Sequence, residues 1–206
     1  LIGLGGSPRA SIKLGEDDKP EADRIFNTSF VLLLAVGIVI SIATYFLSKQ
    51  IVTAFGCPPS AVELAASYLK IYALGTVFVM LAQGLNPFIT AQGRSFIAMC
   101  SVSIGAVANI ALDPIFIFTL DMGVEGASLA TIISQALSCA CILAFFFSKR
   151  SLFRFRIKDA KPNGKRILSI LSLGITPFVM TVTECAIQIV FNINLNASTG
   201  GNKDYT

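Results

Sequence analysis

Long apolar runs separated by short polar segments dominate the chain. The first run extends from Phe26 to Ser48 and contains no charged residue. A run of this length can cross the hydrocarbon core of a bilayer, which needs about 20 residues. Four further runs of similar length follow, at 68–91, 95–118, 124–147 and 173–195. Backbones that span lipid form helices or closed barrels, and barrel strands alternate over about 10 residues, so these continuous runs predict five membrane-spanning helices.

The composition agrees with a chain that lipid surrounds over much of its surface. Hydrophobic residues make up 54% of the 206 positions and charged residues 14%, whereas soluble domains carry about 25% charged residues. We therefore predict an all-α fold, that of a polytopic α-helical membrane protein. The five cysteines are scattered without a CxxC pair, which indicates small core residues rather than a zinc site or a disulfide framework.

The residue types present give little support to catalysis. The chain has no histidine, which is the commonest general base and metal ligand. The glycine-rich segment 3–6 lacks the lysine that would complete a phosphate-binding loop. We therefore expect no enzyme, no ATP-driven motor and no organic cofactor in this stretch.

Lysine and arginine divide unequally between alternate polar segments. The segment before the first run contains four, the turn before the third run one and the segment after the fourth run eight. The intervening segments contain two (counting Lys70, just inside the second run), none and one. Cytoplasmic loops carry an excess of these residues, so the cation-rich segments are predicted to be cytoplasmic. We predict a helix end and a cytoplasmic loop at 1–25, four spanning helices within 26–147, a basic cytoplasmic loop at 148–172, a fifth spanning helix at 173–195 and a truncated external loop at 196–206. We interpret the chain as a piece cut at both ends.

The basic loop has a pattern of its own. It alternates apolar residues with cations from Phe153 to Lys158 and reaches a Pro-Asn-Gly turn at Pro162. One interpretation is a strap attracted to anionic membrane lipid, and the other is a loop that sets orientation and binds nothing. Nucleic-acid binding is not expected, because orientation in the membrane already accounts for the charges.

Apart from Glu125 at the very start of the fourth run, two acidic residues lie inside apolar runs, where a charge is costly and is therefore a candidate for function. The first, Asp113, follows Asn109 by four residues, so both side chains share one helical face. Pro114 clashes with the carbonyl of Ile110, which predicts a kinked helix that presents carboxylate, amide and carbonyl oxygens. Such oxygens suit a proton or Na⁺ site, and we expect no other metal. The alternative is a hydrated carboxylate at the outer end of the helix.

The second acid, Glu184, lies near the middle of the fifth run. Thr181, Gln188 and Asn192 recur with it at spacings of three or four residues, which makes a polar stripe on an apolar helix. The stripe must face protein or a water-filled cavity, because lipid cannot satisfy its polar groups. Glu184 could then exchange a proton, bind a cationic substrate, or only hydrogen-bond to a neighbouring helix.

A third polar stripe lies in the second run. It combines Gln83, Asn86 and Thr90, with Pro87 beside them. These side chains could line a cavity or pack closely against a neighbouring helix, and spacing alone leaves both interpretations open.

Residues 109–118 read NIALDPIFIF, and residues 122–131 read MGVEGASLAT. These segments resemble the fifth helix, the external turn and the start of the sixth helix of multidrug and toxic-compound extrusion (MATE) transporters. Further segments resemble the second, fourth and seventh helices of the family: Gly3–Ser7 with Ser11–Glu16, Tyr68–Gly75, and Gly174–Pro177 with Glu184.

The resemblance implies twelve helices in two six-helix lobes that alternate between inward- and outward-open states. It implies export of organic cations or other small amphipathic drugs across a plasma membrane, here the bacterial inner membrane, in exchange for Na⁺ or H⁺. By this likeness Asn109 and Asp113 belong to the ion site of the amino-terminal lobe. Glu184 would act in substrate or cation coupling, and segment 148–172 would join the lobes. The partners implied are the drugs, membrane lipid and the missing helices of the parent protein.

Other functions remain open from the sequence. A lipid-linked oligosaccharide flippase of the same superfamily would line its cavity with cations to meet pyrophosphate, whereas the runs here carry acids and almost no lysine or arginine. A truncated membrane fragment without transport is another alternative. An integral-membrane enzyme would need a catalytic cluster that the sequence does not offer.

Overall fold

Helices make up most of the described part of the chain. The computed structural model describes residues 1–155 and 164–198, with side chains described as far as Phe191 and at Asn194. Within these residues there is no strand. The elements are α1 (Ile2–Gly15), α2 (Lys19–Ala54), α3 (Val62–Ala91), α4 (Ser95–Pro114), the π-helix η1 (Ile115–Thr119), α5 (Gly123–Phe147) and α6 (Gly164–Ser198).

Five of the helical segments are long and apolar enough to cross a membrane, counted over the described residues. They are α2, α3, α4 continued by η1, α5, and α6 as far as Phe191. The first four segments each contain one of the apolar runs read from the sequence, and the full α6 contains the fifth. The prediction of an all-α polytopic membrane fold is therefore confirmed.

The helices extend past the apolar runs. The segment 1–25 was predicted as a helix end and a cytoplasmic loop, and the structure shows helix as far as Gly15 and again from Lys19 onward. The side chain of Asp18 caps α2, because its Oδ1 accepts a hydrogen bond from the Glu21 backbone N–H at 3.2 Å. α6 begins at Gly164, so the predicted loop does not continue to residue 172. Residues 156–163, and the predicted external loop from residue 199 onward, lie outside the described residues.

The chain remains helical at Pro114. α4 ends there, and the chain continues directly into the π-helix η1, where the Leu120 N–H donates to the Ile115 carbonyl at 3.0 Å. Proline removes one backbone donor of the helix. π-helices are rare and occur mostly as single turns within longer helices. The irregularity that the sequence predicts beside Asp113 therefore takes the form of η1.

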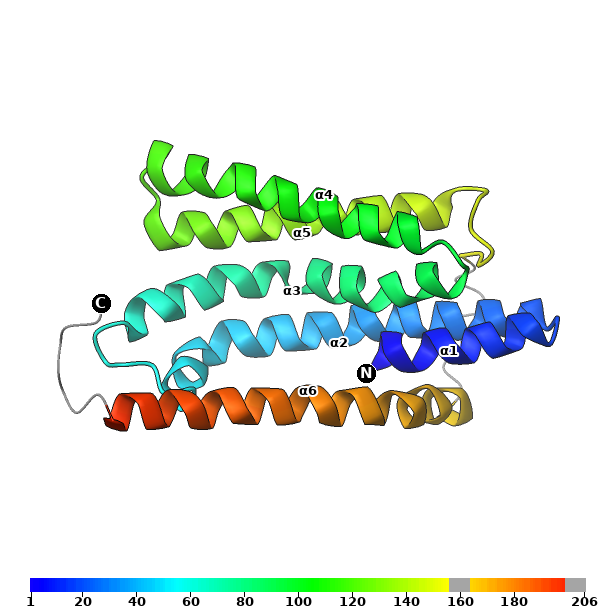
Figure 1. The fold of residues 1–206 in the computed structure, drawn as a ribbon, viewed down its shortest axis with the longest axis horizontal. Coiled ribbons are helices and arrows are strands. Elements are labelled where there is room, and N and C mark those ends of the chain that lie inside the picture. Colours follow the sequence, from blue (N-terminus) through cyan, green and yellow to red (C-terminus); the bar gives the residue numbers. More distant parts are fainter. Residues whose placement is uncertain (156–163, 199–206) are drawn as a thin grey trace.

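The helices lie side by side, with successive spanning helices antiparallel (Figure 1). α3 lies in the middle and packs on α1, α2, α4 and α5, whereas α6 packs on α1 and α2. One end of the bundle gathers the α1–α2 and α3–α4 turns, the end of α5 and the start of α6. The predicted cytoplasmic segments thus share this end, and the predicted external turns share the other.

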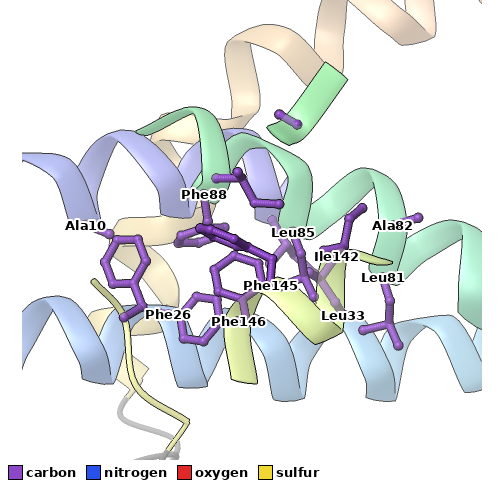
Figure 2. Packing of buried hydrophobic residues seen from close by; sticks show 14 of the residues in the cluster. Ala10, Phe26, Leu33, Leu81, Ala82, Leu85, Phe88, Ile142, Phe145 and Phe146 are labelled. Carbon is purple, nitrogen blue, oxygen red and sulfur yellow. The ribbon is translucent and has the colours of Figure 1, made fainter. Parts of the chain in front are cut away.

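The packed core lies toward the predicted cytoplasmic end, where aromatic side chains from several helices gather (Figure 2). The buried ring of Phe26 in α2 has its centroid 5.4 Å from that of Phe88 in α3 and 4.7 Å from that of Phe146 in α5. Phe153, which follows α5, stacks on Phe26 at 5.3 Å. Ring pairs at such distances stabilise a fold beyond the burial of their area. The segment after α5 is therefore part of the packed bundle.

Candidate functional site

Asp113 and Asn109 meet on one face of α4. The Asn109 side-chain amide Nδ2 donates a hydrogen bond to Asp113 Oδ1 at 3.1 Å, and both residues are half-buried. The same face continues through Gly105 and Ser101, which are buried. The predicted pairing of the carboxylate with the amide is present, while the binding of an ion by this pair stays a prediction.

A cavity of about 300 Å³ lies between α3, α4 and α5 beside this pair. Asn109 lines the cavity, whereas Asp113 is not part of the lining, so the carboxylate adjoins the cavity through the Asn109 amide. The polar lining consists of neutral amides and hydroxyls: Gln83, Asn86, Asn109, Thr131, Ser134, Gln135 and Ser138. The cavity therefore offers many oxygen acceptors next to one carboxylate.

The lining residues from α5 are missing from the stripes that the sequence singled out. Thr131, Gln135 and Ser138 recur at spacings of four and three, the same spacing that marked the stripe on α3. That spacing was the signal that could have found them. The Thr131 hydroxyl donates to the Ala127 carbonyl at 2.9 Å, and the Ser134 hydroxyl donates to the Ala130 carbonyl at 2.7 Å. With their hydrogens used inside the helix, both hydroxyls keep their oxygens as acceptors.

The stripe on α3 lines cavities on two sides of its helix. Gln83 and Asn86 belong to the cavity beside Asn109 and also to a more open groove of about 650 Å³ between α1 and α3, which Thr90 lines as well. Asn86 Nδ2 also donates to a backbone carbonyl of α4 at 3.3 Å. Pro87 lies beside this stripe and has no N–H to donate to the Gln83 carbonyl four residues back. The geometry favours cavity lining over close packing for this stripe.

The charge around both cavities is low. Among the described residues, no charged side chain lines either of them. The same part of the chain contains no group of three or more His, Cys, Asp or Glu side chains that could hold a metal ion. A Na⁺ ion at Asp113 would therefore take one carboxylate together with neutral oxygens, which are suitable ligands for a hard cation.

The stripe predicted on α6 lies apart from these cavities. Thr181, Glu184 and Gln188 are all exposed, and among the described elements α6 packs only on α1 and α2. The Thr181 hydroxyl donates within its own helix, to the Pro177 carbonyl at 3.0 Å. The side chain of Asn192 lies outside those described. The structure does not bring Glu184 to Asp113, and the roles predicted for this stripe stay predictions.

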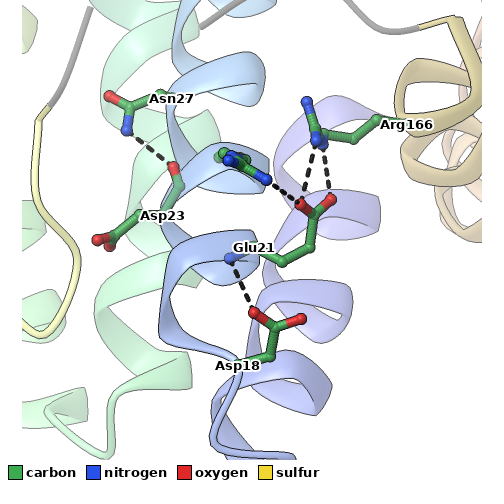
Figure 3. Close-up of polar contacts among 6 residues, drawn as sticks. Asp18, Glu21, Asp23, Asn27 and Arg166 are labelled. Atoms are coloured by element: carbon green, nitrogen blue, oxygen red, sulfur yellow. Dashed lines mark hydrogen bonds and ion pairs between the residues drawn. The ribbon is translucent and has the colours of Figure 1, made fainter. Parts of the chain in front are cut away.

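A second polar cluster, which the sequence analysis did not identify, lies at the predicted cytoplasmic end of α2 (Figure 3). Asp23 is buried, and its Oδ1 accepts a hydrogen bond from the Arg154 backbone N–H at 3.0 Å. Asn27 Nδ2 donates to the Arg154 carbonyl at 2.9 Å and to the Asp23 carbonyl at 2.8 Å. Gln92 Oε1 at the end of α3 accepts from the Leu152 N–H at 2.6 Å. These bonds fix the segment after α5 to two helices, which is a structural role.

The family description MatE matches residues 1–115, which is more than half of the chain. The chain belongs to the MatE family. The multidrug export protein MepA of Staphylococcus haemolyticus (strain JCSC1435) is 33% identical over 202 residues, covering 98% of this chain and 44% of that protein. The protein of the same name from Staphylococcus aureus (strain MSSA476) is 31% identical over 195 residues, covering 95% and 43%. The chain thus spans less than half the length of these MatE relatives.

Solved structures of MATE transporters share the fold. An inward-facing conformation of a multidrug resistance MATE family transporter of the MOP superfamily superimposes with a TM-score of 0.79 at 30% identity, covering 84% of this chain and 40% of that one. An outward-facing conformation gives a TM-score of 0.76 at 24% identity, covering 93% and 50%, which shows the fold alone. The chain is accordingly a multi-pass membrane protein of the MatE family, with the five spanning helices described above.

Proposed function

We propose that the full-length protein that contains this chain is a secondary active antiporter, which exports small organic cations or other amphipathic drugs in exchange for Na⁺ or H⁺. The observation that carries the proposal is the Asp113–Asn109 pair beside a neutral, oxygen-lined cavity inside a helix bundle of the MatE family. The named relatives, which are multidrug export proteins, support the same assignment.

The pair suggests how an ion could be coupled to the cavity. A Na⁺ or a proton that binds Asp113 Oδ1 competes with the Asn109 amide, because that oxygen already accepts a hydrogen bond from Nδ2. In the proposal the Asn109 side chain then turns and presents its carbonyl oxygen to the ion or to the protonated carboxyl. Since Asn109 lines the cavity, the change at Asp113 alters the polar surface that a substrate meets. The cavity would thus respond to an ion that does not itself enter it.

The α6 stripe would supply a second part of the site. Glu184, Gln188 and Thr181 are exposed on a helix that packs, among the described elements, only on α1 and α2, and a charge at mid-membrane needs protein or water beside it. In the proposal these residues face the substrate path together with helices that this chain does not include. Glu184 then attracts a cationic substrate or takes part in ion coupling.

One observation bears on the flippase alternative. A pyrophosphate-linked substrate needs cations in its path. No lysine or arginine lines either cavity in the described part of the chain, so the geometry favours cationic or neutral substrates. A fragment without transport is the remaining alternative, and the experiment below would reveal it.

The test is ion-driven efflux by the full-length protein in proteoliposomes. Ethidium serves as a cationic substrate, and its efflux is measured under an imposed Na⁺ gradient and, separately, under an imposed pH gradient. We expect export under at least one of the two gradients and none without a gradient. Absence of efflux under both gradients, from protein shown to be folded, would overturn the proposal.

A further inference from the structure

The amino-terminal part of α6 is fastened to α1 and α2, while the rest of that helix is not. Ile170 and Gly174 are buried, whereas from Phe178 to Phe191 every residue except Ile189 is exposed. The fastened part lies at the predicted cytoplasmic end of the bundle (Figure 1). Contact between α6 and the other described helices is therefore concentrated at that end.

The first component of this contact is a crossing of α1 and α6 at glycines, where the two backbones approach closely. A Cβ atom added at Gly5 of α1 would lie 2.1 Å from the Ile170 carbonyl oxygen and 2.8 Å from the Gly174 backbone nitrogen of α6. A Cβ atom added at Gly174 would lie 2.3 Å from the Leu1 carbonyl oxygen. Both glycines are needed for this approach, and the backbones of α1 and α6 are in direct contact here.

The second component is a bidentate ion pair between α6 and α2 (Figure 3). Arg166 Nε lies 2.9 Å from Glu21 Oε1, and Arg166 Nη2 lies 3.1 Å from Glu21 Oε2. The Arg166 side chain is only 13% exposed, so this pair is more shielded than a surface ion pair. Arg24, on the same helix as Glu21, reaches the same carboxylate at 3.4 Å. Glu21 thus receives three hydrogen bonds, of which two cross to α6.

The position of Arg166 in its own helix points to the same role. It lies in the first turn of α6, where the helix dipole is positive and a cation is unfavourable. Glu21 lies in the first turn of α2, where an anion is favourable. The cation is therefore held by its partner across the interface rather than by its own helix. Losing Glu21 would leave Arg166 beside like charge at a shielded site.

We propose that Glu21 and Arg166 form a latch that closes the cytoplasmic side of the interface between the amino-terminal lobe and α6. The inference rests on the proposed transport function, because relatives adopt both inward-facing and outward-facing conformations. The Gly5–Gly174 crossing joins α1 to α6, and the ion pair joins α2 to α6. Both contacts must therefore separate when α6 moves away from the amino-terminal lobe on the cytoplasmic side. Glu21 and Arg166 are positioning residues, because they touch neither of the cavities.

The test measures opening directly in the full-length protein. Spin labels are placed at Lys19 on α2 and Leu168 on α6, both exposed, in a background without other cysteines. The Glu21→Gln variant keeps the shape of the side chain and removes its charge. We expect it to raise the ratio of open to closed distances by at least about 5-fold, the lower end of typical coupling between linked sites. The exchanged variant Glu21→Arg with Arg166→Glu should restore the distribution seen without these substitutions.

Arg24→Gln provides the matched control. It removes a charged partner of Glu21 that lies on the same helix, and it leaves the ion pair between Glu21 and Arg166 in place, so the distances should not change. The latch is overturned if Glu21→Gln leaves the distances unchanged, if Arg24→Gln changes them as much, or if the exchange fails to restore them. Because distances are measured without a substrate, a protein that transports nothing can still pass or fail this test.

Discussion

Asp113 is a carboxylate that the chain neither buries fully nor pairs with a cation in the part that the structure describes. It is half-buried, and it accepts a hydrogen bond from the side-chain amide of Asn109. A hydrogen bond from a neutral amide stabilises a carboxylate less than an ion pair does and still leaves room for a competing cation. A residue with a purely structural role would gain more from a fixed, charged partner. At the scale of single residues, the two membrane acids therefore give the sharpest tests.

Asp113→Asn keeps the shape of the side chain and removes its charge. If the carboxylate binds the coupling ion, efflux in the full-length protein should fall by about 100-fold, the upper range of coupling between linked sites. Expression and thermal unfolding temperature should stay unchanged, because the amide can still hydrogen-bond to Asn109. Efflux is measured with ethidium under the gradient that drives the unmodified protein. Normal gradient-driven efflux would reduce Asp113 to a hydrated helix end.

Glu184→Gln separates three roles for the acid on α6. A charged side chain at the centre of a membrane helix costs at least about 2.5 kcal/mol on insertion scales. The presence of Glu184 there therefore indicates a function for its carboxylate. If Glu184 couples ions, the variant should lose efflux of every substrate. If it attracts substrate, the variant should lose efflux of cationic dyes and keep efflux of neutral dyes. Glu184→Asp should then partly restore efflux of the cationic dyes. Efflux of one dye of each kind is measured, and full activity of Glu184→Gln with both dyes would leave only a structural role.

At the scale of elements, the segment after α5 is the part of the basic loop that the structure clarifies. Its alternating pattern places Phe153 inward, stacked on Phe26, while the neighbouring residues Leu152 and Arg154 are exposed. Phe155 continues the aromatic contacts, with its ring centroid 4.8 Å from that of Phe147. The described part of the loop is therefore docked on helices through its backbone and rings. This leaves the exposed cations free to set orientation or to meet lipid headgroups.

Phe153→Ala should destabilise the bundle by about 3 kcal/mol, because it removes a fully buried ring from an aromatic cluster and leaves a cavity. Thermal unfolding in detergent, followed by circular dichroism, measures the effect. Leu152→Ala is the matched control, since its side chain is 43% exposed and its backbone keeps the bond to Gln92. The control should change stability by no more than about 0.5 kcal/mol. Equal effects of the two variants would contradict the docked position of Phe153.

The elements also show how far a sequence can be interpreted alone. Lipid forces spanning segments to be helical, so apolar runs were sufficient to predict the five spanning helices. The Asn109–Asp113 pairing follows from a spacing of four on one helix. Helix ends were misplaced, because polar turns such as that at Asp18 continue a helix beyond its apolar part. Contacts such as Arg154 with Asp23 join residues far apart in the chain, and no local pattern encodes them.

At the scale of the whole molecule, orientation follows from counting charges on the two ends of the bundle. The antiparallel helices bring the cation-rich segments to one end and the cation-poor turns to the other (Figure 1). The structure contains no membrane, so the side that each end faces stays a prediction of the positive-inside rule. The same assignment places the aromatic core and the proposed latch on the cytoplasmic side. The location of both on that side therefore depends on the predicted orientation.

Single cysteines in a background without other cysteines test this orientation in intact cells. Leu120→Cys, in the turn between η1 and α5, should react with a membrane-impermeant thiol reagent, because this turn is predicted to be external. Leu120 is preferred to its neighbour Asp121, whose φ of 52° would strain a cysteine. Arg150→Cys, just after α5, should be protected until the membrane is permeabilised. Both positions are exposed, so a difference in labelling reports the side of the membrane and not burial in the protein. Labelling of Arg150→Cys but not Leu120→Cys in intact cells would show the opposite orientation in the membrane. The Glu21–Arg166 latch would then close the outer side.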